Sequence, residues 1–138
     1  MTRKILLGYD GSDAAGVAAD FAIDLARLYG AELHVLGVAR PPEFGEEVET
    51  EAVIENSRRH YDKVLGALRA RLPGNLRTTF HVAVGHPAEQ IVRYAEQHGI
   101  DHIVVGHRGH TVFERWLIGS VARQVIAYAH CAVTVVRK

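Results

Sequence analysis

The chain has 138 residues, with 16 basic and 16 acidic side chains, so its formal net charge is zero when its histidines are neutral. That balance excludes the basic footprint of a nucleic-acid-binding protein and a polybasic patch for membranes. The apolar runs are too short to span a bilayer, and the first residues lead into a strand-like run rather than a secretory signal. The single cysteine, Cys131, cannot form a disulfide within the chain. We therefore expect a cytoplasmic protein with one domain over residues 1–138, no nucleic-acid partner and no membrane partner.

The first part of the chain alternates between strand-like and helix-like runs. Lys4–Tyr9 is apolar enough to predict a buried first strand. Over Asp13–Tyr29 apolar residues recur at helical spacing, and Gly30 is suited to the C-terminal cap of that helix. Glu32–Ala39 predicts a second strand, and two consecutive prolines follow it closely.

A long second helix is expected over about Val48 to Leu72. Acidic residues prevail in its first half and arginines in its second half, which is the charge order that favours the helix dipole. The simplest interpretation of these charges is a solvated outer face. Pro73 and Gly74 end the helix.

The rest of the chain continues the alternation. We expect strands over Leu76–Val84, His102–Val105 and Ala132–Arg137, and helices over Ala88–His98 and about Ser120 to Tyr128. Five parallel strands linked by crossover helices predict a doubly wound α/β fold with helices on both faces of the sheet. In such sheets ligands bind beyond the carboxyl ends of the strands, where the strand order reverses.

Two glycine-bearing loops carry the chemistry. Gly8-Tyr9-Asp10-Gly11-Ser12 follows the first strand, and Gly106-His107-Arg108-Gly109 follows the fourth. Glycines let the backbone turn tightly and approach a ligand, and successive N–H groups in such a turn form an anion-binding nest. Gly119-Ser120 then opens the last helix, whose unpaired N–H groups and dipole favour phosphate. A phosphate chain would therefore lie between the two glycine turns, with Arg108 supplying positive charge.

Simpler interpretations exist for these residues. Loop glycines are often turn residues only, and for either turn alone that interpretation is favoured. Ser120 is suited either to cap the last helix or to donate to a phosphate oxygen. Asp10 is suited to accept from ribose hydroxyls or to hold magnesium, and the alternative is that it only caps the first helix. Both glycine turns on one strand–loop–helix unit, together with Asp10, favour a phosphate site.

The spacing G-x2-G-x9-G-S from Gly106 to Ser120 resembles the ATP-binding signature of the universal stress protein family. The resemblance covers nearly the whole chain and includes Ile5–Ser12, Leu33–Val38, Gly85–Ile91, Asp101–Gly106 and Ala129–Arg137. One departure is Ala132, where the family often has proline, and it concerns only the entry to the last strand. His107 and His110 stand where the family often has serine and a basic residue. When protonated, these histidines could donate to phosphates and make binding sensitive to pH.

The resemblance implies a strand order of 3-2-1-4-5, with ATP, alone or with Mg²⁺, over the ends of the first and fourth strands. Gly8 and Asp10 would line the adenosine, and Val38 would contact adenine. The loop after the fourth strand would wrap the ribose and phosphates, and the start of the last helix would close the phosphate site. The implied nucleotide-binding residues are Gly8, Asp10, Val38, Gly106, His107, Arg108, Gly109, His110, Thr111, Val112, Gly119, Ser120, Val121 and Ala122.

Other functional signals are absent or weak. The sequence has no G-x4-G-K-[ST] run and no G-x-G-x-x-G run, which excludes the P-loop and dinucleotide fingerprints. The spacings of the nine histidines do not form a metal-ligand set, so no metal site is expected. Asp10 lacks the adjacent acidic partner of a magnesium-dependent phosphoacceptor, and no general base accompanies it. No catalytic residue is therefore assigned.

Three functions stay open on these grounds. A regulatory ATP-binding protein of the stress response is favoured, and the alternatives are a slow ATPase and an interaction module with a vestigial nucleotide site. The family commonly dimerises through its last strand, so the resemblance also implies a homodimer through Ala132–Arg137. That apolar strand, at a sheet edge, would promote aggregation unless something covered it. A monomer whose edge is shielded by another segment is the alternative.

Overall fold

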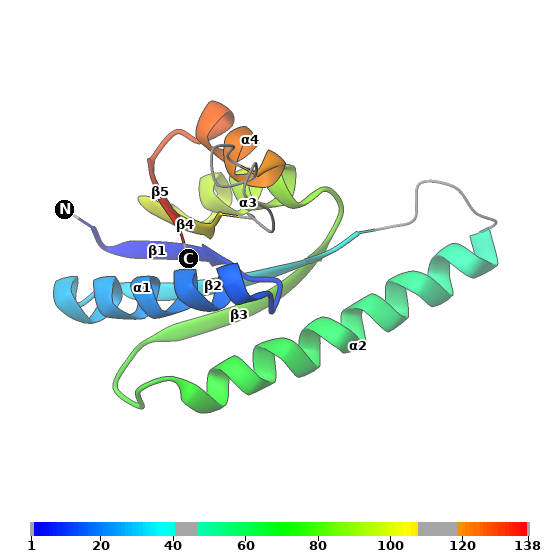
Figure 1. Cartoon of the computed structure of the whole chain (residues 1–138), viewed down its shortest axis with the longest axis horizontal. Helices are drawn as coiled ribbons and strands as arrows, with labels where there is room; N and C mark the ends of the chain where they lie inside the picture. The colour runs from blue at the N-terminus through cyan, green and yellow to red at the C-terminus, as the bar shows by residue number, and fades with distance from the viewer. Residues whose placement is uncertain (1, 41–46, 108–118, 138) are drawn as a thin grey trace.

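The computed structural model describes residues 2–40, 47–107 and 119–137, along which strands and helices alternate (Figure 1). The elements are β1 (Lys4–Gly8), α1 (Asp13–Tyr29), β2 (Glu32–Ala39), α2 (Glu47–Arg71), β3 (Thr78–Val84), α3 (Pro87–Gln97), β4 (His102–Gly106), α4 (Ser120–Tyr128) and β5 (Ala132–Val136). Every predicted element is present, and the largest difference in bounds is the start of β3. Leu76 precedes that strand because its N–H donates to the carbonyl of Pro73 at 3.2 Å, in a turn.

The strands form one parallel sheet in the order β3-β2-β1-β4-β5. β1 lies at its centre, where Ile5 is in register with Leu33 of β2 on one side and with His102 of β4 on the other. The middle of β1, residues 5–7, is fully buried, as expected for a parallel strand covered on both faces. The predicted fold class and strand order are confirmed.

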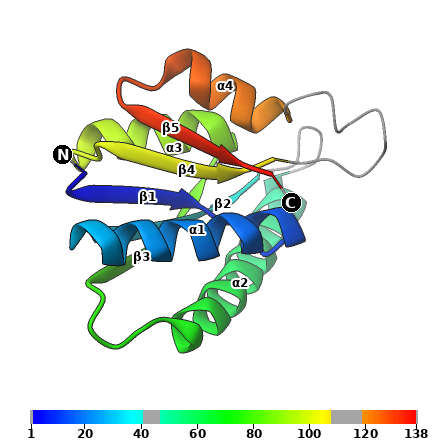
Figure 2. The ribbon, with the colours of Figure 1, turned by 60° about the vertical axis from the view of Figure 1, so that its left-hand side comes forward.

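Helices cover both faces of this sheet, with α1 and α2 on one face and α3 and α4 on the other (Figure 2). Successive strand residues point to opposite faces, so each face has its own core. Ile5 and Leu7 belong to the core with α1 and α2, whereas Leu6 belongs to the core with α3 and α4.

Local sequence signals set the ends of α1 and α3. Ser12 caps α1, because its Oγ accepts from the N–H of Ala15 at 3.2 Å. Gly30 ends α1 in the left-handed conformation, at a φ of 63°, which glycine adopts without a steric penalty. Pro87 opens α3, where a missing N–H costs nothing. The predicted cap residue, Gly30, is confirmed.

α2 is anchored to the sheet through its C-terminal half. Leu65 and Leu68 are buried in the core, and the guanidinium of Arg69 lies 4.5 Å from the centre of the Phe80 ring. The amino-terminal half of α2 extends away from the strands (Figure 1). Among the helices that the structure describes, none is long and apolar enough to cross a membrane.

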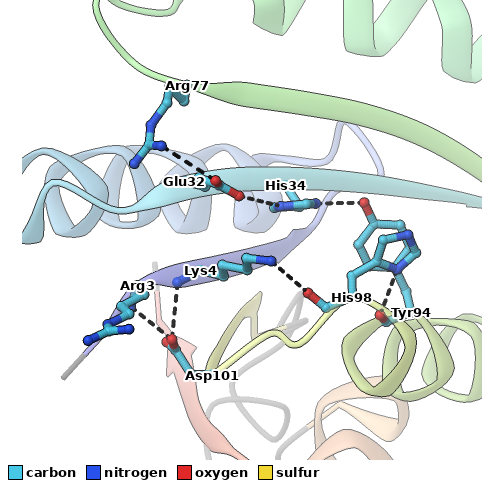
Figure 3. A network of polar contacts seen from close by, with 8 residues as sticks. All are labelled: Arg3, Lys4, Glu32, His34, Arg77, Tyr94, His98 and Asp101. Carbon is cyan, nitrogen blue, oxygen red and sulfur yellow. Dashed lines mark hydrogen bonds and ion pairs between the residues drawn. The ribbon is translucent and has the colours of Figure 1, made fainter.

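A network of polar side chains lies near the amino ends of β1, β2 and β4 (Figure 3). Glu32 pairs with Arg77 at 3.5 Å, and its second carboxylate oxygen lies 3.4 Å from Nε2 of His34. Nδ1 of the buried His34 lies 2.7 Å from the hydroxyl of Tyr94, whose ring stacks on that of His98. Because a carboxylate only accepts, we assign the neutral tautomer with the proton on Nε2, so the Tyr94 hydroxyl donates to Nδ1.

The pKa shifts of two histidines make stability depend on pH. Burial lowers the pKa of His34 although Glu32 opposes the shift, and burial also lowers the pKa of His102. The unfolded chain, with histidine pKa values of about 6.5, therefore binds more protons than the fold does below that pH. We expect the free energy of unfolding to be fully maintained above about pH 6.5 and to fall as the pH drops through the folded-state pKa values.

Urea unfolding between roughly pH 5 and pH 8 measures this effect. The His34→Gln and His102→Gln variants should each show a shallower fall toward acid pH than the unmodified chain. Equal slopes for all three proteins would contradict the role given to the two imidazoles.

Candidate functional site

A pocket of about 390 Å³ lies beyond the carboxyl ends of β1, β2 and β4. The chain changes its direction of winding between β1 and β4, so the pocket occupies the place where doubly wound sheets bind ligands. Its described wall consists of Gly8, Tyr9, Asp10, Ser12, Ala14, Ala15, Leu36, Val38, Arg40, Ser57, Tyr61, Pro87, Ile91, Val105, Gly106, Gly119, Val121 and Ala122.

The loop after β1 places Asp10 in the wall of the pocket. Oδ1 of Asp10 accepts from the N–H of Ser12 at 2.9 Å, which fixes the turn that leads into α1. Gly11 has a φ of +79°, and a Cβ there would lie only 2.9 Å from a methyl group of Val64, so both conformation and space require glycine. Asp10 therefore lines the pocket and also orders the loop, while the cap position itself belongs to Ser12.

The end of β4 brings its backbone against the first turn of α1. A Cβ on Gly106 would lie 2.6 Å from the carbonyl oxygen of Ala14, so only glycine allows this approach. The next residue, His107, is 5% exposed and lies outside the described wall. Its N–H donates to the carbonyl of Val136 at 2.8 Å, which joins the end of β4 to the end of β5.

The start of α4 forms another part of the wall. Gly119 occupies the N-cap position and provides no side-chain cap to the first turn. Val121 and Ala122 line the pocket, whereas Ser120 is exposed and lies outside the described wall. The predicted residues Arg108, Gly109, His110, Thr111 and Val112 lie outside the described residues.

The structure thus brings together Gly8, Asp10, Val38, Gly106, Gly119, Val121 and Ala122 from the predicted set. It adds wall residues that sequence reasoning missed, above all Arg40 after β2 and Ser57 and Tyr61 on α2. A signal for the last two existed, because their hydroxyls interrupt an otherwise apolar face of the long helix. No signal marked Arg40, which differs little from the other exposed arginines.

The pocket combines an apolar surface with features that attract an anion. Leu36, Val38, Ile91, Val105 and Val121 supply the apolar part. The first turns of α1, α3 and α4 all contribute wall residues, and the amino end of a helix carries partial positive charge. Within the described part of the chain, no group of three or more histidine, cysteine, aspartate or glutamate side chains is placed to hold a metal ion. The arrangement suits a ligand with one flat apolar end and one anionic end.

Known proteins resemble this chain over its full length. The universal stress protein family matches residues 1–137. A universal stress protein of Methanocaldococcus jannaschii is 35% identical, with 99% of this chain and 82% of the relative covered. One from Thermus aquaticus is 36% identical, with 99% of this chain and 100% of the relative covered. The structure of the universal stress protein UspA of Lactobacillus plantarum matches with a TM-score of 0.85 at 28% identity, covering 99% and 98% of the two chains.

Two structural neighbours with lower identity carry adenine nucleotides. A universal stress protein in complex with cAMP matches with a TM-score of 0.66 at 22% identity, covering 98% of this chain and 97% of the neighbour. An Arabidopsis thaliana family protein with AMP bound matches with a TM-score of 0.70 at 14% identity, covering 99% and 92%. At these identities the two neighbours establish the shared fold. The family match over residues 1–137 and the two relatives at 35% and 36% identity show that the chain belongs to the universal stress protein family.

Proposed function

We propose that this universal stress protein binds an adenine nucleotide, ATP alone or with Mg²⁺, in the pocket beyond β1 and β4, and that occupancy regulates a stress response. The pocket itself carries the proposal, because it combines an apolar wall with the amino ends of three helices. The cAMP and AMP bound to two structural neighbours support an adenine nucleotide as the ligand class.

The order of the strands fits the parts of a nucleotide. β2, β1 and β4 are successive neighbours in the sheet, and adjacent strands lie about 4.8 Å apart, so their ends span roughly 10 Å. The apolar Val38 near the end of β2 suits the base, and the Asp10 carboxylate at the end of β1 suits ribose hydroxyls. Gly106 and the start of α4 suit the phosphates. Arg108–Val112, which the family resemblance places on ribose and phosphates, complete the proposed site.

Calorimetric titration tests the site, and we expect ATP to bind more tightly than GTP. Asp10→Ala should weaken ATP binding about tenfold or more, which corresponds to about 1.4 kcal/mol. Asp10→Asn keeps an oxygen for the Ser12 N–H, so a loss in that variant also reports the carboxylate charge rather than a disordered loop. If Asp10→Ala lowers thermal stability but leaves ATP affinity unchanged, Asp10 is a structural residue only.

The nucleotide carried by the purified protein separates binding from turnover. Protein denatured after purification should release ATP into the supernatant, as read on a nucleotide column. ADP or AMP with steady phosphate release would instead indicate the slow ATPase. Failure to retain or bind any adenine nucleotide would overturn the proposed function and leave the interaction module.

We also propose that the protein forms a homodimer through β5. β5 is an edge strand of the sheet, and its middle residues, Val133 and Val135, are apolar and partly exposed. α1 and α4 both contact β5 and expose large apolar side chains, Phe21, Leu28, Ile126 and Tyr128. Pairing two such edges about a two-fold axis would satisfy backbone groups and bury apolar surface.

Light scattering tests the dimer at tens of micromolar protein. A mass of twice the 15.2 kDa chain is expected, and Val135→Pro should yield monomer, because proline removes a backbone donor from the strand. Val53→Thr, at an exposed position on α2, is the surface control and should remain dimeric. A mass near that of one chain for the unmodified protein would rule the dimer out.

A further inference from the structure

The inner face of α2 is mostly aliphatic but carries hydroxyl groups where the helix reaches the pocket. Between residues 51 and 71, the side chains that are at least partly buried are Ile54, Ser57, Tyr61, Val64, Leu65 and Leu68, which share one helical face. Ser57 and Tyr61 are the two members of this set with hydroxyl groups, and both line the pocket. The other four are aliphatic. The polar groups on this face therefore coincide with the pocket.

The Tyr61 ring lies directly against the backbone of β2. A Cβ built on Gly37 would lie 2.5 Å from Cδ1 of Tyr61, so the ring occupies the space that any larger residue would fill. Gly37 has no positive φ, so its role here is the absence of a side chain. It stands between Leu36 and Val38, which both line the pocket. Gly37 thereby brings an aromatic ring to the end of β2.

α2 is anchored to the rest of the fold by residues other than Tyr61. Leu65 and Leu68, further along the helix, are 4% and 1% exposed and belong to the core with α1. Arg69 and Arg71 add contacts to Phe80 and Asp20. Tyr61 itself is only partly buried. A partly exposed aromatic ring in a pocket wall, on a helix that other residues anchor, is well placed to contact a ligand.

We propose that Tyr61 forms a wall of the nucleobase subsite and sets the preference for purines, with its ring packed against the base. This inference rests on the proposed function, since it places the phosphates at the start of α4 and hence the base at the β2 end of the pocket. Stacking on an aromatic ring stabilises a bound base, and the effect is larger for a purine because the overlapping area is larger.

Tyr61→Ala is expected to weaken ATP binding roughly tenfold or more, as measured by calorimetry. CTP binding should weaken less, so the ratio of the two dissociation constants should move toward one. Tyr61→Phe keeps the ring and should retain most of the affinity and the purine preference. Tyr29→Ala removes a 45% exposed tyrosine that lies outside the pocket wall, and it should bind ATP as the unmodified chain does.

Gly37→Ala provides a second test, because its effect on ATP affinity should depend on the presence of the Tyr61 ring. The added methyl group should push the Tyr61 ring into the pocket and weaken ATP binding several-fold. In the Tyr61→Ala background the contact at 2.5 Å no longer exists, so Gly37→Ala should have no further effect. Additive losses in the double variant would contradict the proposed coupling.

The outcomes separate this inference from the proposed function. If the unmodified chain binds no adenine nucleotide, the proposed function fails and this inference fails with it. If the unmodified chain binds ATP and Asp10→Ala weakens that binding while Tyr61→Ala does not, the inference alone is overturned. Loss of both affinity and purine preference in Tyr61→Ala, with melting temperature maintained, supports it.

Discussion

Replacing Gly106 by alanine is expected to lower the free energy of unfolding by about 2–3 kcal/mol and to weaken nucleotide binding severely. The new Cβ would lie 2.6 Å from the carbonyl oxygen and 2.8 Å from the carbonyl carbon of Ala14, and both are backbone atoms. No side chain can rotate out of the way, so β4 and the first turn of α1 would have to separate. That separation would open the pocket between its α1 and β4 walls.

Gly66→Ala is the matched control for this substitution. Gly66 lies in α2, is exposed, and has open space where a Cβ would be added. Alanine there should raise the free energy of unfolding by about 0.5–1 kcal/mol, because glycine weakens a helix interior. Urea unfolding with calorimetric ATP titration measures both variants. A Gly106→Ala protein as stable as the Gly66→Ala protein would show that the contact with Ala14 relaxes freely.

Replacing Tyr94 by alanine is expected to cost about 3–5 kcal/mol of stability, the usual loss for a large buried aromatic side chain. Tyr94 is 7% exposed and holds α3 against β2 through its 2.7 Å contact with Nδ1 of His34. α3 also supplies Pro87 and Ile91 to the pocket wall, so the loss should extend to ligand affinity.

Tyr94→Phe separates the hydroxyl from the ring. It keeps the stacking on His98 but leaves the buried Nδ1 of His34 without its donor, so a loss of about 1–3 kcal/mol is expected. Tyr29→Phe, which removes the hydroxyl of a 45% exposed tyrosine, should change stability by less than about 0.5 kcal/mol. Chemical denaturation of the three variants checks these values, and a Tyr94→Phe protein as stable as the unmodified chain would contradict the role given to the hydroxyl.

The sequence predicted the elements well because their signals are local and strong. The 3.6-residue period of α1, the apolar run of β1 and the Gly30 cap each fix an element without reference to the rest of the chain. Strand order required more than periodicity, and the family resemblance supplied it. The start of β3 differed from its predicted position because it depends on a turn hydrogen bond that composition does not reveal.

The candidate site was only partly predictable for a physical reason. Asp10, Gly106 and Gly119 lie at strand and helix ends, where doubly wound sheets are expected to bind ligands. Tyr61 and Ser57 lie mid-helix, and their approach to the pocket depends on how α2 crosses the sheet over Gly37. That crossing is set by tertiary packing of Leu65 and Leu68, which sequence spacing alone does not orient. The burial of His107 likewise follows from contacts between distant strands.

The central position of β1 has a consequence for how the chain folds. β2 follows β1 closely in the sequence, whereas β4, the other neighbour of β1, is made much later. The N–H of Lys4 donates to the carboxylate of Asp101, 97 residues further along the chain. Contacts of such large sequence separation slow folding, because the intervening loop must be ordered first. Until β4 is available during synthesis, Ile5–Leu7 form an exposed apolar edge. The nascent chain should therefore be most prone to aggregation before its last third is made.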